Sequence, residues 1–305
     1  MSITTALFLA LGLFTVYYLV IFTGAVRAAR AAGEIAKPSM LGIATGAITN
    51  FLDDLGIGSY ATTTSIFRST KQVRDEKIPG TLNVGHTLPT VVEALAAFAL
   101  FKTAISPVTL VEMIAAATAG AWLGARVFGR WPRRKIQIGM GFCLLAAVGV
   151  MFYRQVWGSP TDPAGGGILK LGGLALIIGV TGNFVLGMLM TLGIGLYAPC
   201  MILISLLGMG PTAAYPVMMG SCAFLMPVAS ATFIKEKSWD MKASFGLLIG
   251  GIPAVLVAAF LVKSMPTVVL KWVVMAVVVY TAINMLLTAR REKVMAPDLA
   301  PAATH

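Results

Sequence analysis

Uninterrupted apolar runs of roughly 20 residues recur along almost the whole chain, and they constrain its fold more than any other feature. A helix of that length matches the hydrocarbon thickness of a bilayer. Only 11% of the residues are charged, against about 25% in ordinary soluble domains. A soluble fold of 305 residues cannot bury so much apolar surface. The sequence therefore predicts an all-α, polytopic membrane protein and excludes a water-soluble enzyme.

The predicted membrane segments follow one another with short linkers. They occupy residues 6–26, 38–67, 82–102, 107–127, 136–153, 169–208, 213–233, 243–262 and 267–288. The three cysteines, Cys143, Cys200 and Cys222, lie inside these runs without the spacing of metal ligands. We therefore expect no disulfide framework, no metal site and no other cofactor.

Basic residues indicate which linkers face the cytoplasm. Of the 23 Lys and Arg residues, 18 lie in alternate linkers and in the C-terminal stretch. These segments are 27–37, 68–77, 126–135, 235–242 and the residues after 288. By the positive-inside rule they are cytoplasmic, which leaves the N-terminus on the opposite, periplasmic side. The net charge of +11 therefore reflects topology, and we expect no nucleic-acid partner.

Two of the apolar runs begin and end on the same side of the membrane and are interrupted in the middle. The run 38–67 is interrupted by Leu-Gly-Ile-Gly at 55–58, and the run 169–208 by the same four residues at 192–195. Residues 55–62 and 192–199 match at six of eight positions. Because glycine breaks helices, we expect each run to form a hairpin of two arms. The first hairpin dips into the membrane, and the second is longer, so that a full crossing by its first arm is the alternative.

The repeated break predicts two halves that are inverted in the membrane. The first half starts at the cytoplasmic face and the second at the periplasmic face, and each holds a broken hairpin followed by three transmembrane helices. The expected organisation is an N-terminal helix with its cytoplasmic linker (1–37), repeat 1 (38–154), a periplasmic linker (155–168), repeat 2 (169–288) and a cytoplasmic tail (289–305). Inverted pairs of broken helices are typical of transporters, with the substrate site between them.

The departing arm of each hairpin presents unpaired N–H groups and a partial positive charge, which favour an anion. No catalytic residue is expected. The predicted substrate-binding residues are Asn50, Gly56, Gly58, Ser59, Tyr60, Thr62, Thr63, Asn183, Gly193, Gly195 and Tyr197. The alternative for the hydroxyl groups is that they bond back to their own helix, and for the glycines that they only allow close packing.

Four ionisable residues within the apolar runs are candidates for coupling transport to a proton or cation. Asp53 and Asp54 end the first arm, where the helix dipole disfavours a negative charge. His86 and Glu93 share one helix face. Because adjacent helical residues point about 100° apart, we expect one aspartate to face the site and the other to cap the break or to reach a base such as His86. The alternative is a purely structural polar network.

The doubled Asn-Phe and Leu-Gly-Ile-Gly segments, with the helix pattern of each half and the chain length, resemble the TauE/SafE sulfite-exporter-like permeases. The resemblance covers about residues 40–290. It implies the transport of small sulfur-containing anions, such as sulfite or organosulfonates, across the inner membrane by alternating access. The expected partners are the anion, a coupling ion and the bilayer, and nothing in the sequence indicates an oligomeric state.

Other functions remain open. An uptake carrier for a small organic anion has the same layout. A soft-metal carrier is suggested by the 17 methionines, although methionine in apolar helices more often serves packing. A scaffold membrane protein does not need two matched breaks. An intramembrane aspartyl protease is disfavoured because Asp53 and Asp54 are adjacent.

Overall fold

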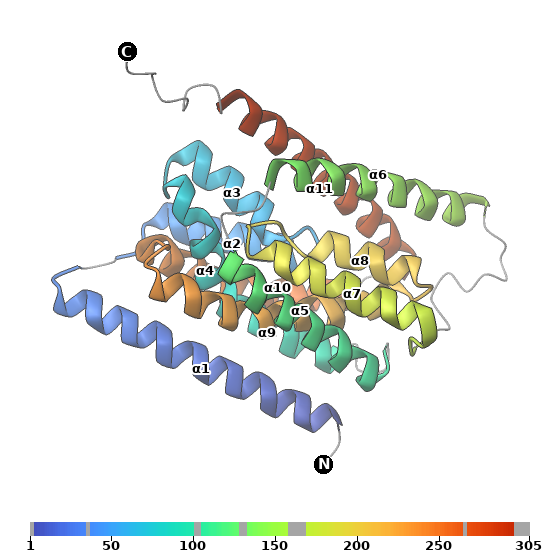
Figure 1. The fold of residues 1–305 in the computed structure, drawn as a ribbon, viewed down its shortest axis with the longest axis horizontal. Coiled ribbons are helices and arrows are strands. Elements are labelled where there is room, and N and C mark those ends of the chain that lie inside the picture. Colours follow the sequence, from blue (N-terminus) through green and yellow to red (C-terminus); the bar gives the residue numbers. More distant parts are fainter. Residues whose placement is uncertain are drawn as a thin grey trace.

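The computed structural model describes residues 3–34, 37–100, 105–127, 133–157, 169–264 and 267–295, and these ranges are helical without any strand (Figure 1). The α-helices are α1 (Ile3–Ala31), α2 (Met40–Asp54), α3 (Ser59–Thr70), α4 (Ile78–Leu100), α5 (Pro107–Val127), α6 (Arg133–Trp157), α7 (Gly173–Met190), α8 (Tyr197–Leu206), α9 (Pro211–Lys235), α10 (Met241–Ser264) and α11 (Thr267–Met295). A single 3₁₀ turn, η1 (Asp75–Lys77), precedes α4. Most of the predicted linker 155–168 and the end of the tail lie outside the described residues.

The helices agree with the predicted membrane segments. Each long interrupted run forms a pair of helices, α2 with α3 and α7 with α8. Within the described residues, five helices are long and apolar enough to cross a bilayer: Ile3–Ala31, Pro107–Arg126, Gly173–Met190, Thr212–Lys235 and Met241–Leu261. The all-helical fold and its membrane character are therefore confirmed.

The helices pack in an order that mixes the two halves of the chain. Neighbours in the main series are α2, α10, α4, α9, α5 and α7, in that order. Helices α6 and α11 pack on each other and contact the departing arms, α8 above all. Exchanging α2 with α7, α4 with α9 and α5 with α10 reverses the main series and leaves every neighbouring pair in it the same. Helix α1 lies along the opposite edge from α6 and α11 (Figure 1), where it packs mainly on α9.

Glycines hold the arriving arm of each hairpin tightly against a helix of the other half. A Cβ atom on Gly46 of α2 would lie 2.6 Å from the Cα of Leu247 in α10. A Cβ atom on Gly187 of α7 would overlap the backbone of Ala117 in α5. Small residues permit this close approach of helix backbones in membranes. The arms α2 and α7 are therefore fixed on α10 and α5.

Helix α1 is attached to the bundle by a polar contact as well as by apolar packing. The hydroxyl of Tyr18 donates a hydrogen bond of 2.7 Å to the carbonyl of Val84 in α4, and both residues are buried. The outer face of α1 exposes large apolar side chains, including Leu13 and Val20. An exposed apolar face of this kind is suited to lipid contact.

Candidate anion site at two helix breaks

The first break is a tight turn that needs glycine. Helix α2 ends at Asp54, and Gly56 and Gly58 follow with φ angles of 92° and 85°. Residues with a Cβ atom avoid this left-handed region. The amide of Gly56 donates to the carbonyl of Asp53 at 2.7 Å, and the amide of Ile57 donates to the carbonyl of Leu52 at 3.0 Å. These bonds close the end of α2 before α3 departs.

The second break uses glycine in the same way. Helix α7 ends at Met190, and the amide of Gly193 donates to its carbonyl at 2.9 Å. The φ angle of Gly193 is 78°. Gly195 has no left-handed φ, and a Cβ atom added there would lie 3.6 Å from the Cβ of Tyr60 in the other hairpin. The two breaks therefore approach each other closely.

The first amide of α3 is not unpaired, which corrects the expectation that both departing arms present free N–H groups. The amide of Ser59 donates to Oδ1 of Asp53 at 2.8 Å. The turn through Gly56 and Gly58 brings the end of α2 back to the start of α3, so that the Asp53 carboxyl reaches across the break. Asp53 is the residue that caps the break, and it does so from the arriving arm.

The second departing arm has no such cap. Helix α8 begins at Tyr197, and no side chain accepts a hydrogen bond at its N-cap residue, Leu196. The residues aligned with Asp53 and Asp54 are Met190 and Thr191, neither of which is acidic. Thr191 donates its hydroxyl to the carbonyl of Met188 at 2.7 Å. The two tips are therefore alike in shape and unlike in charge.

The predicted polar face of α4 is fully buried, and His86 ties both arms of the first hairpin to it. Nδ1 of His86 lies 2.8 Å from Oδ1 of Asn50 in α2, and Nε2 lies 3.0 Å from the hydroxyl of Thr63 in α3. The ring of Tyr60 stacks on His86 with centroids 6.1 Å apart. A neutral imidazole satisfies both contacts, with one nitrogen donating and the other accepting. This geometry favours a positioning role for His86.

Glu93, two turns further along α4, contacts the other hairpin. The hydroxyl of Tyr197 donates to Oε2 of Glu93, and the carboxyl is completely buried. Its second oxygen, Oε1, has no hydrogen-bond partner, and neither has Oδ2 of the buried Asp54. Buried polar atoms without partners are uncommon and call for a specific explanation. Helix α4 thus links the tips of both hairpins through His86 and Glu93.

The hydroxyl groups at the start of α3 divide into three kinds. Thr62 donates to the carbonyl of Ser59 at 2.8 Å, and Ser65 donates to the carbonyl of Ala61 at 3.0 Å, so both bond back to their own helix. Thr63 instead contacts His86. Thr64 has a buried hydroxyl without any partner.

Asn183, the counterpart of Asn50, also connects its arm to other helices. Its amide nitrogen donates to the carbonyl of Met113 in α5 at 2.7 Å and to the hydroxyl of Ser221 in α9 at 2.9 Å. Asn50 and Asn183 therefore hold the arriving arms α2 and α7 in place, and neither lines a pocket described below. Their geometry is that of positioning residues.

A small pocket lies where the tips of the two hairpins, the breaks at residues 55–58 and 192–195, meet. Six predicted residues line it: Asp53, Gly58, Ser59, Tyr60, Gly195 and Tyr197. Four further residues complete its wall: Thr90, Met190, Leu196 and Cys222. The pocket has about 10 Å³ of room for the centre of a water molecule, which is close to the least that one water requires. Its wall is drawn from both halves of the chain.

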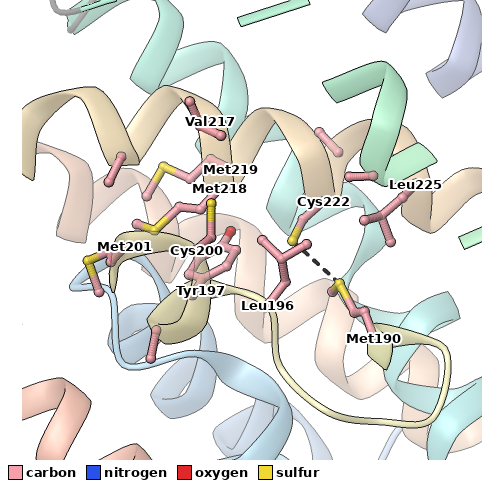
Figure 2. Packing of buried hydrophobic residues seen from close by; sticks show 14 of the residues in the cluster. Met190, Leu196, Tyr197, Cys200, Met201, Val217, Met218, Met219, Cys222 and Leu225 are labelled. Atoms are coloured by element: carbon pink, nitrogen blue, oxygen red, sulfur yellow. Dashed lines mark hydrogen bonds between the residues drawn. The ribbon is translucent and has the colours of Figure 1, made fainter. Parts of the chain in front are cut away.

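Sulfur atoms gather on one side of this pocket. Figure 2 shows Cys222 pointing at Met190, with the two sulfur atoms 3.5 Å apart. Cys200, Met201, Met218 and Met219 lie close by (Figure 2) and are buried. Within the described residues, no group of three or more His, Cys, Asp or Glu side chains is arranged to hold a metal ion.

Met190 and Cys222 were not among the predicted site residues. Met190 has a signal in the sequence, because the repeat alignment pairs it with Asp53. Cys222 has no comparable signal, since its position in the pocket depends on the packing of α9 between α4 and α5. Five of the other predicted residues lie near the breaks without lining this pocket: Asp54, Gly56, Thr62, His86 and Glu93. Gly193 lines a second pocket, on the side of its break that faces away from the first.

The fold and the pocket together define a class of protein. Broken helices that meet at buried, polar tips inside an apolar helical bundle are characteristic of membrane permeases. The model of the family described as "Sulfite exporter TauE/SafE" matches residues 174–304 and so confirms the resemblance over the second half of the chain. Together with the apolar helices, the match supports a membrane transport protein. No curated protein and no solved structure matches the chain.

Proposed function

We propose that this protein carries a small sulfur-containing anion, sulfite or an organosulfonate, across the bacterial inner membrane by alternating access. The observation that carries the proposal is the pocket shared by the two helix breaks, with wall residues from both halves. In its present form the pocket holds about one water. An anion of several heavy atoms therefore requires one of the tips to move, as alternating access demands.

The proposal includes an inverted repeat. Two findings support it: exchanging the halves leaves the neighbouring pairs of the main helix series the same, and the basic residues fall in alternate linkers. With the positive linkers inside, the N-terminus is periplasmic and the C-terminus cytoplasmic. Two halves of opposite orientation supply two equivalent conformations, one open to each side.

We further propose that Asp53 couples anion binding to a proton. Its carboxylate accepts the hydrogen bond from the Ser59 amide, which is the group that an incoming anion needs at the start of α3. Carboxylate and substrate therefore compete for the same donor and repel each other. Proton uptake by Asp53 removes the negative charge and weakens its hold on the amide, so anion and proton bind together.

Flux measurements in proteoliposomes test the transport proposal. Sulfite, sulfate and organosulfonates such as isethionate are offered with and without a pH gradient. We expect uptake of at least one of these anions, faster when a gradient drives protons in the same direction. If none of these anions is carried above the rate of protein-free vesicles, the proposed function is wrong.

The substitution Asp53→Asn separates coupling from folding. Asparagine keeps an oxygen that accepts from the Ser59 amide but cannot take up a proton. We expect the variant to bind the anion at all pH values and to lose acceleration by the pH gradient. Asp54→Asn is the matched control, because Asp54 does not line the pocket. Gradient-driven flux that persists in both variants moves the coupling role to His86 and Glu93.

Gly195→Val tests the place of the anion. Gly195 has an ordinary φ angle and faces Tyr60 across the pocket, so a branched side chain fills the space without straining the turn. We expect at least a tenfold loss of anion affinity with normal insertion. Gly24→Val is the control, because a Cβ atom on Gly24 meets nothing within 4 Å. Undiminished binding in the Gly195 variant places the site elsewhere.

The sulfur-containing side chains in Figure 2 support a second candidate function, a carrier for a soft metal ion such as Cu(I), because thiol and thioether groups are soft ligands. Cys222 and Met190 supply soft ligands at the pocket itself. Uptake of Cu(I) or Ag(I) in the same proteoliposomes distinguishes the two candidates. Metal uptake abolished by Cys222→Ala, without any anion flux, supports the metal carrier over the anion carrier.

A further inference from the structure

A second pocket lies on the other side of the Gly193–Gly195 turn, between α3, α6 and α11. Its polar wall comes from Thr64 of α3, Gln137 of α6 and Asn284 and Thr288 of α11. It has about 30 Å³ of room for the centre of a water molecule, three times that of the pocket at the tips. None of the residues that line it is charged.

Two side chains on this wall have buried oxygen atoms that no group of the protein satisfies. The hydroxyl of Thr64 and Oε1 of Gln137 lack hydrogen-bond partners, although the residues are only 6% and 4% exposed. Thr64 is unusual in this respect, because Thr62 and Ser65 on the same helix bond to backbone carbonyls. The amide of Gln137 can rotate to present either its oxygen or its NH₂ group. Unsatisfied groups that converge on a cavity indicate a polar occupant.

Basic residues lie about one helical turn from the polar wall, on the side away from the helix breaks. Arg68 is four residues after Thr64, which places both on the same face of α3, although its Nε also pairs with Asp75 at 3.2 Å, which offsets part of its charge. Arg134 is three residues before Gln137, and its Nε donates to the carbonyl of Ala289 at 3.0 Å, next to Thr288. Positive charge around a neutral polar opening raises the local concentration of anions. The outer end of the pocket is therefore suited to attract a negatively charged ligand.

The inner end of this pocket shares a wall with the pocket at the tips. Gly195 lines both, so the turn that contains it is the partition between them. Thr281 of α11 contacts the carbonyl of Ile57 at 3.4 Å, which ties α11 to the first break. Helix α11 thus borders both breaks but leaves a pocket beside the second one.

We propose that the pocket between α3, α6 and α11 is a vestibule in which a small oxyanion is bound by Thr64, Gln137, Asn284 and Thr288 before it reaches the helix tips. This inference rests on the proposed anion transport and adds to it a second binding site and a route. The turn at Gly193–Gly195 is then the inner gate. Because the surrounding basic residues belong to the predicted cytoplasmic segments, the vestibule opens to the cytoplasm.

Substitution of the unsatisfied side chains tests the vestibule by flux. Thr64→Val keeps the shape of the side chain and removes its hydroxyl, and Gln137→Leu removes the amide. Each variant loses a hydrogen bond to the anion, so we expect kcat/KM for sulfite to fall about tenfold. Thr118→Val is the matched control, because the Thr118 hydroxyl bonds to the carbonyl of Ile114 and lines neither pocket. Equal kcat/KM in all three variants and the parent overturns the inference.

Chemical blocking provides a second readout that does not depend on hydrogen-bond strength. Thr288→Cys is treated with a membrane-impermeant maleimide, the excess reagent is removed, and sulfite flux is then measured. The thioether is stable to sulfite, Cys143 is replaced by alanine in every variant, and the natural Cys200 and Cys222 are buried. Ser69→Cys is the control, because Ser69 is exposed on α3 and lines neither pocket.

The outcomes separate the vestibule from the proposed function. Labelling at both positions with loss of flux only in the Thr288 variant supports the vestibule. A Thr288 variant that does not label, or that labels and still transports like the parent, overturns the vestibule and leaves anion transport intact. A parent protein that carries no sulfur anion overturns the proposed function and the vestibule with it.

Discussion

Replacing Gly46 by alanine is expected to destabilise the protein, although alanine is normally the better helix former. Gly46 lies where α2 crosses α10, and the added Cβ atom would lie 2.6 Å from the Cα of Leu247 and 2.7 Å from its carbonyl oxygen. All of these neighbours are backbone atoms, which cannot rotate away as the end of a flexible side chain can. The two helices themselves must move apart.

The size of the effect follows from this distance. Ordinary contact of a Cβ atom begins at 3.4 Å, so the helices must separate by about 0.8 Å at this point. Overpacking of this kind costs about 1–3 kcal/mol. Because Gly250 also fits closely against the backbone of Ile43, the separation loosens a second contact along the same seam. We therefore expect about 2 kcal/mol, which for a chain of 305 residues corresponds to a fall in Tm of roughly 3 °C.

Thermal unfolding in detergent measures this change, with a dye that fluoresces when it reacts with thiols. With Cys143 replaced by alanine throughout, the remaining Cys200 and Cys222 are buried and free, so they report unfolding when they become accessible. Gly12→Ala is the matched control, because its Cβ atom meets nothing within 4 Å on α1. A Gly46 variant that unfolds within 1–2 °C of the parent, or no earlier than the Gly12 variant, refutes the close packing of α2 and α10.

Two further predictions use paired positions. Tyr197→Phe removes the hydrogen bond that the Glu93 carboxyl accepts and should destabilise the protein by about 1–3 kcal/mol. Tyr60→Phe removes a hydroxyl without a partner and should have little effect in the same thermal assay. Equal losses would contradict the assignment of these contacts. Single cysteines introduced at Arg74 and Asp162 test the topology in intact cells: an impermeant thiol reagent should label position 162 alone, and labelling at 74 alone reverses the predicted orientation.

The helices were predictable because the bilayer imposes their length and composition. The apolar runs 107–127 and 169–208 reappear as α5 and as the α7–α8 pair with nearly the same ends. The breaks were predictable for a local reason, since Gly56, Gly58 and Gly193 adopt angles that other residues avoid. Features that depend on the thickness of the membrane or on backbone sterics are thus visible in the sequence.

The contacts within the site were not predictable to the same degree. Tyr197 reaches Glu93 across 104 positions of the chain, and no local pattern encodes that distance. Gln137 and Thr288 lie next to basic residues, so they look like the ends of membrane segments until α6 and α11 are seen to pack together. The cap of Ser59 by Asp53 was expected in kind, but the choice between two adjacent aspartates depends on the path of the turn.

The mixed packing order also determines when the protein can fold during its synthesis. Helix α2 ends at Asp54, but its main partner α10 begins only at Met241. At about 5–20 residues per second, the ribosome needs roughly ten to forty seconds to make the intervening chain. During that time the buried polar groups of α2, Asn50 among them, lack the surface that later covers them. The insertion machinery must therefore keep these polar groups of the nascent first half out of contact with lipid until the last helices are inserted.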